Sequence, residues 1–328
     1  MANPRLIGLC AMLVCAMLVC ASCASTTKPS KRPQKPPPRS SGTSAAILVD
    51  VPITFEVSSR TLHTAMVHGK VNGVATTLIL DTGSTDHVLT IDLARRASIE
   101  SAVDKPGTDH SGASVPSWKL GEVSVLIGDK SFKLDPAIAI KGPPPFKGWG
   151  IGGFISPQRL HPTAFTVLDF VSNKLLVVEG SARAVRPVIQ RRVPKLVPVV
   201  LDRSAKHVRP VIKAAVHPFK AVWACLNTGG RHTEFVESAV AGLESRRQGA
   251  DVVGVSGTRG RTLQVENQIL RVAEASFPMS KLLVRRSMQP DALIGMNVLK
   301  STVLVLHTSA KQPVIWFVPA AATTSRTR

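Results

Sequence analysis

The residues best suited to chemistry are the four of Asp81-Thr82-Gly83-Ser84, which follow the apolar run Leu78-Ile79-Leu80. Three apolar residues that lead into Asp-Thr-Gly predict a buried strand ending in a tight turn, with a carboxylate at its tip. A carboxylate held in such a place can accept a proton as a general base. The motif is short enough to occur by chance, so its value depends on the surrounding sequence.

A weaker copy of this segment, Ala-Cys-Leu-Asn-Thr-Gly-Gly, places Asn227-Thr228-Gly229 at an offset of 146 residues (227 − 81). The two segments align without a gap, and the identical pairs are Val51/Val197, Pro52/Pro198, Ser58/Ser204, Ala75/Ala221, Leu80/Leu226, Thr82/Thr228 and Gly83/Gly229. Further along, we expect Ile151-Gly152-Gly153 to correspond to Ile294-Gly295-Met296, and Thr166-Val167-Leu168 to Thr302-Val303-Leu304. The preserved order predicts an internal duplication.

Short runs rich in Val and Ile surround both turns and favour strands over helices. The strands expected in the first half are Ile53–Val57, Ala65–Val71, Ala75–Leu80, Val123–Ile127, Phe132–Leu134, Trp149–Ile155, Thr166–Phe170 and Leu175–Val178. Asn72-Gly73 and Gly128-Asp129-Lys130 predict hairpin turns between neighbouring strands. Ile91–Ser98 is expected to be a short helix. The sequence therefore predicts an all-β fold with few short helices.

Together, the strand, Asp-Thr-Gly-Ser, the later apolar-apolar-Gly motif and the closing hairpin resemble the retropepsin-like aspartic peptidases. The two-part arrangement in one chain is similar to that of pepsin-type enzymes and their bacterial relatives. The resemblance covers about Val51 to Val318. It implies two duplicated aspartic-protease-like β-barrel lobes with a cleft between them. It also implies a hairpin flap over the substrate. Gly107–Gly112 and Gly254–Gly260 lie where such a flap is expected, and plain surface hairpins are the alternative.

In that family, two carboxylates share one proton and activate a water molecule that attacks a peptide bond. The resemblance makes Asp81 the catalytic carboxylate. The residues expected to support the two loops are Thr82, Gly83, Ser84, Thr228 and Gly229. Asn227 stands where the partner carboxylate belongs, and an amide can form hydrogen bonds but cannot exchange a proton. Without a charged neighbour, Asp81 is expected to titrate near the reference pKa of about 3.9.

Three interpretations stay open at this point. The chain could be an aspartic endopeptidase-like hydrolase that keeps activity, for example by pairing the Asp81 loops of two chains in a homodimer. It could be a pseudoenzyme, a catalytically inactive protease relative that binds extended peptides or cell-wall material. It could also be a structural envelope lipoprotein whose cleft has no ligand. If Arg231 paired with Asp81, it would hold the carboxylate in its ionised form and oppose catalysis.

The N-terminus predicts export. Arg5 precedes the apolar stretch Leu6–Ala21, and small residues then lead to Cys23. This ending resembles a bacterial lipoprotein signal, which implies a signal peptide over residues 1–22, lipidation of Cys23 and location in the cell envelope. Simple secretion and an uncleaved anchor are the alternatives.

The rest of the chain divides by composition. Residues 23–44 form a linker rich in Pro, Lys and Ser, which cannot bury enough apolar surface to fold. The lobes are expected at 45–185 and 197–318, joined by a basic linker at 186–196, with a disordered tail at 319–328. The net charge is +20, but no nucleic-acid-binding motif accompanies it, so we expect no nucleic acid partner. The expected partners are a peptide or protein substrate and, through the lipid anchor, a membrane.

The histidines and cysteines indicate no metal or cofactor. The nine histidines are scattered without metal-ligand spacing. Four of the five cysteines fall in the first 23 residues, and Cys225 alone remains for the folded part. A small, buried apolar side chain is the role expected for Cys225.

Overall fold

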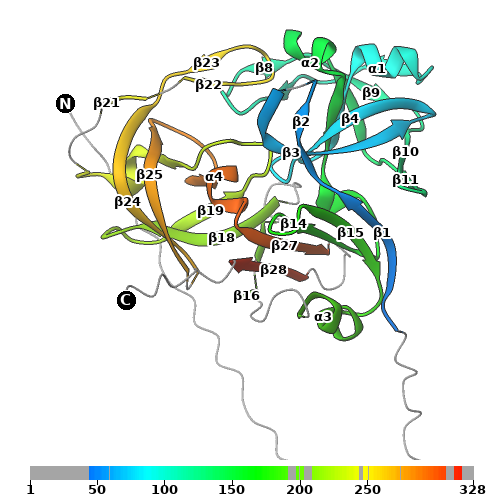
Figure 1. Cartoon of the computed structure of the whole chain (residues 1–328). Helices are drawn as coiled ribbons and strands as arrows, with labels where there is room; N and C mark the ends of the chain where they lie inside the picture. The colour runs from blue at the N-terminus through cyan, green and yellow to red at the C-terminus, as the bar shows by residue number, and fades with distance from the viewer. Residues whose placement is uncertain are drawn as a thin grey trace, which may run out of the picture. The chain divides into compact units, whose positions relative to one another are not determined.

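The chain is described here by a computed structural model, shown in Figure 1. It describes residues 44–58, 60–190, 197–198, 200–202, 209–243, 247–249, 251–273, 275–307 and 314–319. These residues belong to one compact unit, Gly42–Arg328. The predicted signal peptide, Cys23, all of the linker except Ser44 and all of the tail except Pro319 lie outside the described residues. Within the described ranges, no helix is long and apolar enough to span a membrane.

Strands dominate the described residues, so the predicted all-β fold is confirmed. The α-helices among these residues are α1 (Ile91–Arg96), α2 (Pro144–Trp149), α3 (Ala182–Gln190) and α4 (Met296–Leu299). The helix α1 matches the expected one closely, and it begins at the N-cap Thr90, whose side chain accepts a hydrogen bond from the Leu93 N–H.

The first-half sheet contains ten strands. They are β2 (Thr54–Val57), β3 (Arg60–Val71), β4 (Val74–Leu80), β5 (His87–Thr90), β6 (Ser101–Val103), β9 (Ser117–Leu120), β10 (Ser124–Ile127), β11 (Lys130–Lys133), β12 (Ala137–Ile140) and β13 (Ile151–Ile155). The order is β11-β10-β3-β4-β13-β5-β12-β9-β6, with β2 paired to β3. The predicted turn between β3 and β4 is confirmed, since Asn72 and Gly73 both take positive φ angles of 41° and 86°.

The second-half sheet contains β17 (Val200–Asp202), β18 (Arg209–Val216), β19 (Val222–Leu226), β20 (Glu234–Val236), β21 (Arg247–Gln248), β24 (Leu263–Val272), β25 (Ala275–Arg285) and β26 (Ala292–Ile294). Its central order, β18-β19-β26-β20-β25, repeats the order β3-β4-β13-β5-β12 of the first half. The directions agree as well. The pairs β4–β13 and β19–β26 are parallel, β13–β5 and β26–β20 are antiparallel, and β5–β12 and β20–β25 are parallel.

A third sheet joins strands from both halves. It contains β1 (Ala46–Pro52), β14 (Phe165–Asp169), β15 (Lys174–Glu179), β16 (Val197–Pro198), β27 (Thr302–His307) and β28 (Val314–Pro319), in the order β1-β15-β14-β27-β28-β16. At its centre β14 lies antiparallel to β27, with Leu168 opposite Leu304. One continuous hydrophobic cluster contains buried residues of both halves, including Leu80, Leu226 and Leu304. This core fixes the ends of β4 and β19, from which the two Thr-Gly turns begin.

Three helices, α2, α3 and α4, lie where none was expected. Trp149 was placed at the start of a strand but ends α2, which has proline at its first position and closes on Gly150 with a φ of 68°. The helix α3 runs into the segment expected to be the basic linker 186–196, and residues 191–196 lie outside the described residues. Cys225 is buried, as expected of a small apolar side chain, and its Sγ donates to Leu226 O at 3.7 Å.

Candidate active site at the Asp81 and Asn227 loops

The Asp81 loop (residues 81–84) and the Asn227 loop (residues 227–230) leave their strands in the same way. The Asp81 N–H donates to Ile155 O at 2.9 Å, and the Asn227 N–H donates to Ile294 O at 2.9 Å. Ile155 and Ile294 are therefore equivalent. The alignment of Ile151 with Ile294 is wrong by four residues, because Gly153 serves the close approach of β13 to β5, where a Cβ atom would meet Val88 O.

Two threonines lock the loops together. The Thr82 N–H donates to Thr228 Oγ1 and the Thr228 N–H donates to Thr82 Oγ1, both at 3.0 Å. Each hydroxyl then donates across the interface: Thr82 Oγ1 to Leu226 O and Thr228 Oγ1 to Leu80 O, both at 2.5 Å. Both threonines are fully buried. These reciprocal contacts hold the two loops against each other. That the two threonines support catalysis stays a prediction.

The glycines bring the two key side chains to one place. The Gly83 N–H donates to Asp81 Oδ1 at 2.8 Å, and the Gly229 N–H donates to Asn227 Oδ1 at 3.1 Å. Each glycine also faces the opposite side chain: a Cβ atom on Gly83 would lie 2.5 Å from Asn227 Oδ1, and one on Gly229 would lie 2.5 Å from Asp81 Oδ1. Only a residue without a side chain fits at either position. Asp81 and Asn227 therefore share one site.

Ser84 has no counterpart hydroxyl in the second loop, where Gly230 takes its place. Its Oγ donates to Asp86 O at 2.7 Å, so the hydroxyl holds the chain after the loop. Its carbonyl accepts hydrogen bonds from Ser156 Oγ at 3.1 Å and Gln158 Nε2 at 3.0 Å. Ser84 therefore stabilises the loop from outside.

Asp81 is in an environment that disfavours its charge. Burial raises the pKa of its carboxyl above the ordinary value, and this effect exceeds the opposing influence of three backbone N–H groups (Gly83, Ser84 and Gly229) and of the charge on His110. The expectation of a pKa near the reference value is therefore wrong, because it considered only charged neighbours and left out burial. A carboxyl with a raised pKa is suited to proton transfer closer to neutral pH.

Arg231 does not hold Asp81 in the ionised form. Its side chain is exposed, and among the described residues no ion pair joins it to Asp81. The possibility that this arginine blocks proton exchange at the carboxylate is thus not realised.

Both Gly-rich segments expected to be flaps form hairpins. The strands β7 (Gly107–Thr108) and β8 (Ser114–Val115) pair in the first hairpin, and β22 (Val252–Val253) and β23 (Arg259–Gly260) pair in the second. The hairpins contact each other, because the Ser256 N–H donates to Asp109 Oδ2 at 3.0 Å. Asp109 Oδ1 is held in turn by the Ser111 N–H at 2.8 Å.

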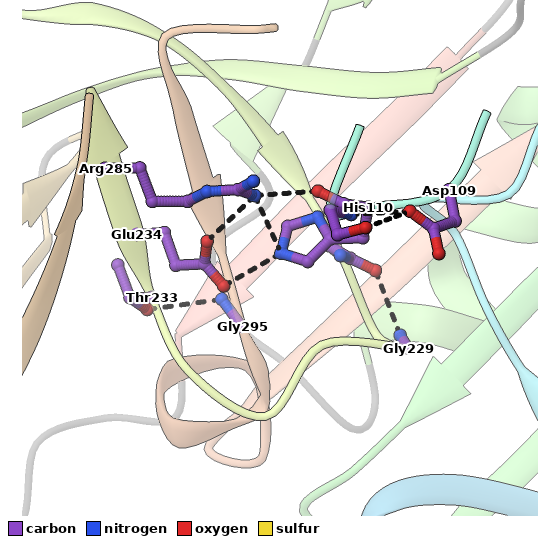
Figure 2. A network of polar contacts seen from close by, with 9 residues as sticks. Asp109, His110, Gly229, Thr233, Glu234, Arg285 and Gly295 are labelled. Carbon is purple, nitrogen blue, oxygen red and sulfur yellow. Dashed lines mark hydrogen bonds and ion pairs between the residues drawn. The ribbon is translucent and has the colours of Figure 1, made fainter. Parts of the chain in front are cut away.

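A polar network that the sequence did not reveal ties the first hairpin to the second half (Figure 2). His110 Nε2 forms a hydrogen bond with Glu234 Oε1 at 2.9 Å. Arg285 Nη1 donates to His110 O at 2.7 Å and lies 3.4 Å from His110 Nε2. Arg285 Nη1 also lies 3.6 Å from Glu234 Oε2. Glu234 lies in β20 among buried residues. A carboxylate inside an otherwise apolar strand is the feature of the sequence that could have revealed this network.

The described residues contain no group of three or more His, Cys, Asp and Glu side chains that could hold a metal ion. The arrangement is instead one carboxyl, one amide and backbone N–H groups. Such a set can bind a water molecule or a carbonyl oxygen and can move one proton at Asp81.

Comparison with known families agrees with this geometry in the first half. The family model for aspartyl protease matches residues 67–147, which contain the Asp81 loop and the first hairpin. No curated protein matches the chain. Residues 67–147 are thus similar to the aspartyl protease family.

Proposed function

We propose that this protein binds an extended peptide over the paired loops and hydrolyses peptide bonds, with Asp81 as its catalytic carboxylate. The observation that carries the proposal is the reciprocal locking of the Asp81 and Asn227 loops through Thr82 and Thr228. The raised pKa of the Asp81 carboxyl supports the proposal, because a base that activates water must exchange a proton near the working pH. The matching strand order supports a duplicated, two-lobed origin for the site.

In the proposed reaction, ionised Asp81 takes a proton from water while the water oxygen attacks the peptide carbonyl. The amide of Asn227 can hold the water or the carbonyl oxygen by a hydrogen bond, but it supplies no proton. The place beside Asp81 is filled by the Asn227 loop of the same chain, which favours a site completed within one chain over the pairing of two Asp81 loops.

A second candidate is a pseudoprotease that binds peptides without cleaving them, and Asn227 is the residue that favours it. In either case we propose an exported protein, anchored in the cell envelope through Cys23. The apolar stretch Leu6–Ala21 and the small residues before Cys23 support this location.

The test is cleavage of a mixed peptide library by the full-length protein between pH 3 and 8, read by mass spectrometry. Asp81→Asn should lower the rate by about 10²–10⁴-fold, the usual contribution of a positioned general base. Asp86→Asn is the matched control, since it removes a nearby carboxylate and leaves the loop intact. Cleavage by Asp81→Asn at the wild-type rate would refute the proposal. Peptide binding without any cleavage by the wild-type protein would favour the pseudoprotease.

A further inference from the structure

Glu234 and Arg285 form a buried charged pair in neighbouring strands, β20 and β25, of the second-half sheet. Their side chains are 5% and 9% exposed, and among the described residues no hydrogen bond reaches Glu234 Oε2. Burying such a pair costs more solvation free energy than its attraction commonly returns. A buried carboxylate kept at this cost, beside a candidate active site, points to a function.

The third member of the network is His110, which reaches Glu234 from the first hairpin (Figure 2). A carboxylate that accepts from one ring nitrogen fixes the tautomer of an imidazole and leaves the other nitrogen for proton exchange. Glu234 Oε1 lies 2.9 Å from Nε2, and Arg285 Nη1 lies 3.4 Å from the same nitrogen. A carboxylate can only accept, so a bond with Glu234 puts a proton on Nε2. No described residue forms a hydrogen bond with Nδ1. The side chain is 30% exposed, so Nδ1 can meet a ligand.

The backbone of the hairpin is held as firmly as the ring. Arg285 Nη1 donates to His110 O at 2.7 Å, and the Ser256 N–H fixes the neighbouring Asp109 at 3.0 Å. The hairpin is thus anchored on both sides of His110, by a buried arginine and by the second hairpin. These contacts give the imidazole a defined position.

His110 also acts on the Asp81 site. Its positive charge lowers the pKa of the Asp81 carboxyl, as does the Gly229 N–H, although burial has the larger and opposite effect. Gly229 belongs to the Asn227 loop and lies against the Asp81 carboxyl. The link is also geometric: Glu234, the partner of His110, pairs with Leu293 on β26, and the next residue, Ile294, accepts the Asn227 N–H.

We propose that His110 supplies the proton that Asn227 cannot, and that Glu234 and Arg285 are its positioning residues. This inference rests on the proposed peptidase function. As the water oxygen bonds to the peptide carbon, Asp81 takes a water proton and His110 Nδ1 gives its proton to the carbonyl oxygen, which forms a neutral gem-diol. When the C–N bond breaks, Asp81 returns its proton to the amine, and one gem-diol hydroxyl returns a proton to His110.

This mechanism requires an ionised Asp81 and a protonated imidazole at the same time. The charged groups in contact with His110 are Glu234 and Arg285 from the second half, Asp109 precedes it in its own hairpin, and its charge also acts on Asp81. The mechanism therefore predicts that the rate falls at high pH, once the acid has lost its proton.

The first experiment is the pH dependence of peptide cleavage by the full-length protein. We expect His110→Gln to lower kcat by about 10²-fold or more and to remove the alkaline fall in rate, since the acid contributes about 10²–10⁴-fold. Glu234→Gln should keep that fall in rate but lower kcat, because the ring loses its orientation. His68→Gln, which alters a histidine on β3 outside the network, is the control. An unchanged rate and pH profile in His110→Gln would overturn the inference.

The second experiment needs no turnover. The ring of His110 is titrated by NMR in the wild-type protein and in Asp81→Asn, where the hairpin network is intact. The midpoint should move to lower pH in Asp81→Asn, because a negative neighbour is lost. An unmoved midpoint, or cleavage that needs Asp81 but not His110, overturns this inference alone. Failure of the wild-type protein to cleave any peptide overturns the proposed function and the role of His110 with it.

Discussion

Each hydrogen bond that the Asp81 loop donates to the Asn227 loop is matched by one that the Asn227 loop donates back. Both first residues accept a glycine N–H on Oδ1, at 2.8 Å in one loop and 3.1 Å in the other, and both loops exchange threonine hydrogen bonds of 3.0 Å. A carboxylate and an amide oxygen serve equally well as acceptors. The loop geometry therefore does not depend on a charge at position 227, and the chemistry can change while the scaffold stays.

The surroundings of the two loops differ more than the loops do. In the first half, His87 Nδ1 accepts from the Ser156 N–H at 3.3 Å, and in the second half, Thr233 Oγ1 accepts from the Gly295 N–H at 3.2 Å. The hydrogen bond is equivalent, but only one acceptor can titrate. Burial lowers the pKa of His87 to about 4, so this imidazole is neutral at physiological pH.

The largest effect is expected from the threonines. Thr82→Val and Thr228→Val should each lower the free energy of unfolding by about 2–4 kcal/mol, because each leaves a buried carbonyl and a buried N–H without a partner. Denaturant unfolding measures both. Thr85→Val is the control and should change stability by at most about 0.5 kcal/mol, since that side chain is only partly buried. If Thr82→Val lowered the free energy of unfolding strongly and Thr228→Val did not, the two threonines would not be equivalent.

The next effect is a pH dependence confined to the first half. The folded state of His87 binds its proton less readily than the unfolded state, so stability is lost as the pH falls from about 6.5 to 4. This loss amounts to about 3 kcal/mol at most. His87→Thr introduces the residue type found at the equivalent position, Thr233. It should remove that part of the stability loss at acid pH. Thr233→Val, the control, should lower stability by the same amount at every pH. If the free energy of unfolding depended on pH in the same way in His87→Thr and in the wild-type protein, this prediction would be contradicted.

The sequence predicted the strands around Asp81 and the turn at Asn72-Gly73 because those signals are local. It also placed Asp81 and Asn227 in one site, because the repeated segment was gap-free up to that point. It took Ile151 instead of Ile155 as the equivalent of Ile294. The glycines of β13 look like the apolar-apolar-Gly motif, but they serve the close approach of β13 to β5. It missed His110, Glu234 and Arg285, which are far apart in sequence and meet only when the hairpin folds onto the second half.

The two facing residues, Asp81 and Asn227, could be predicted from the sequence, but the raised pKa of Asp81 could not. The raised pKa of Asp81 comes from burial by both halves, and no spacing of residues reports that quantity. In the same way, Arg231 follows the Asn227 loop in sequence but leaves Asp81 unpaired because its side chain points to solvent.

The most direct test of the shared site is a carboxyl ¹³C NMR titration of Asn227→Asp in the full-length protein. If the two loops meet, the carboxyls at positions 81 and 227 must share one proton and titrate in two well-separated steps. The signal of Asp86 should titrate as in the wild-type protein. Two carboxyls that titrate independently, with Asp81 unchanged from the wild-type protein, would show that the loops do not form one site.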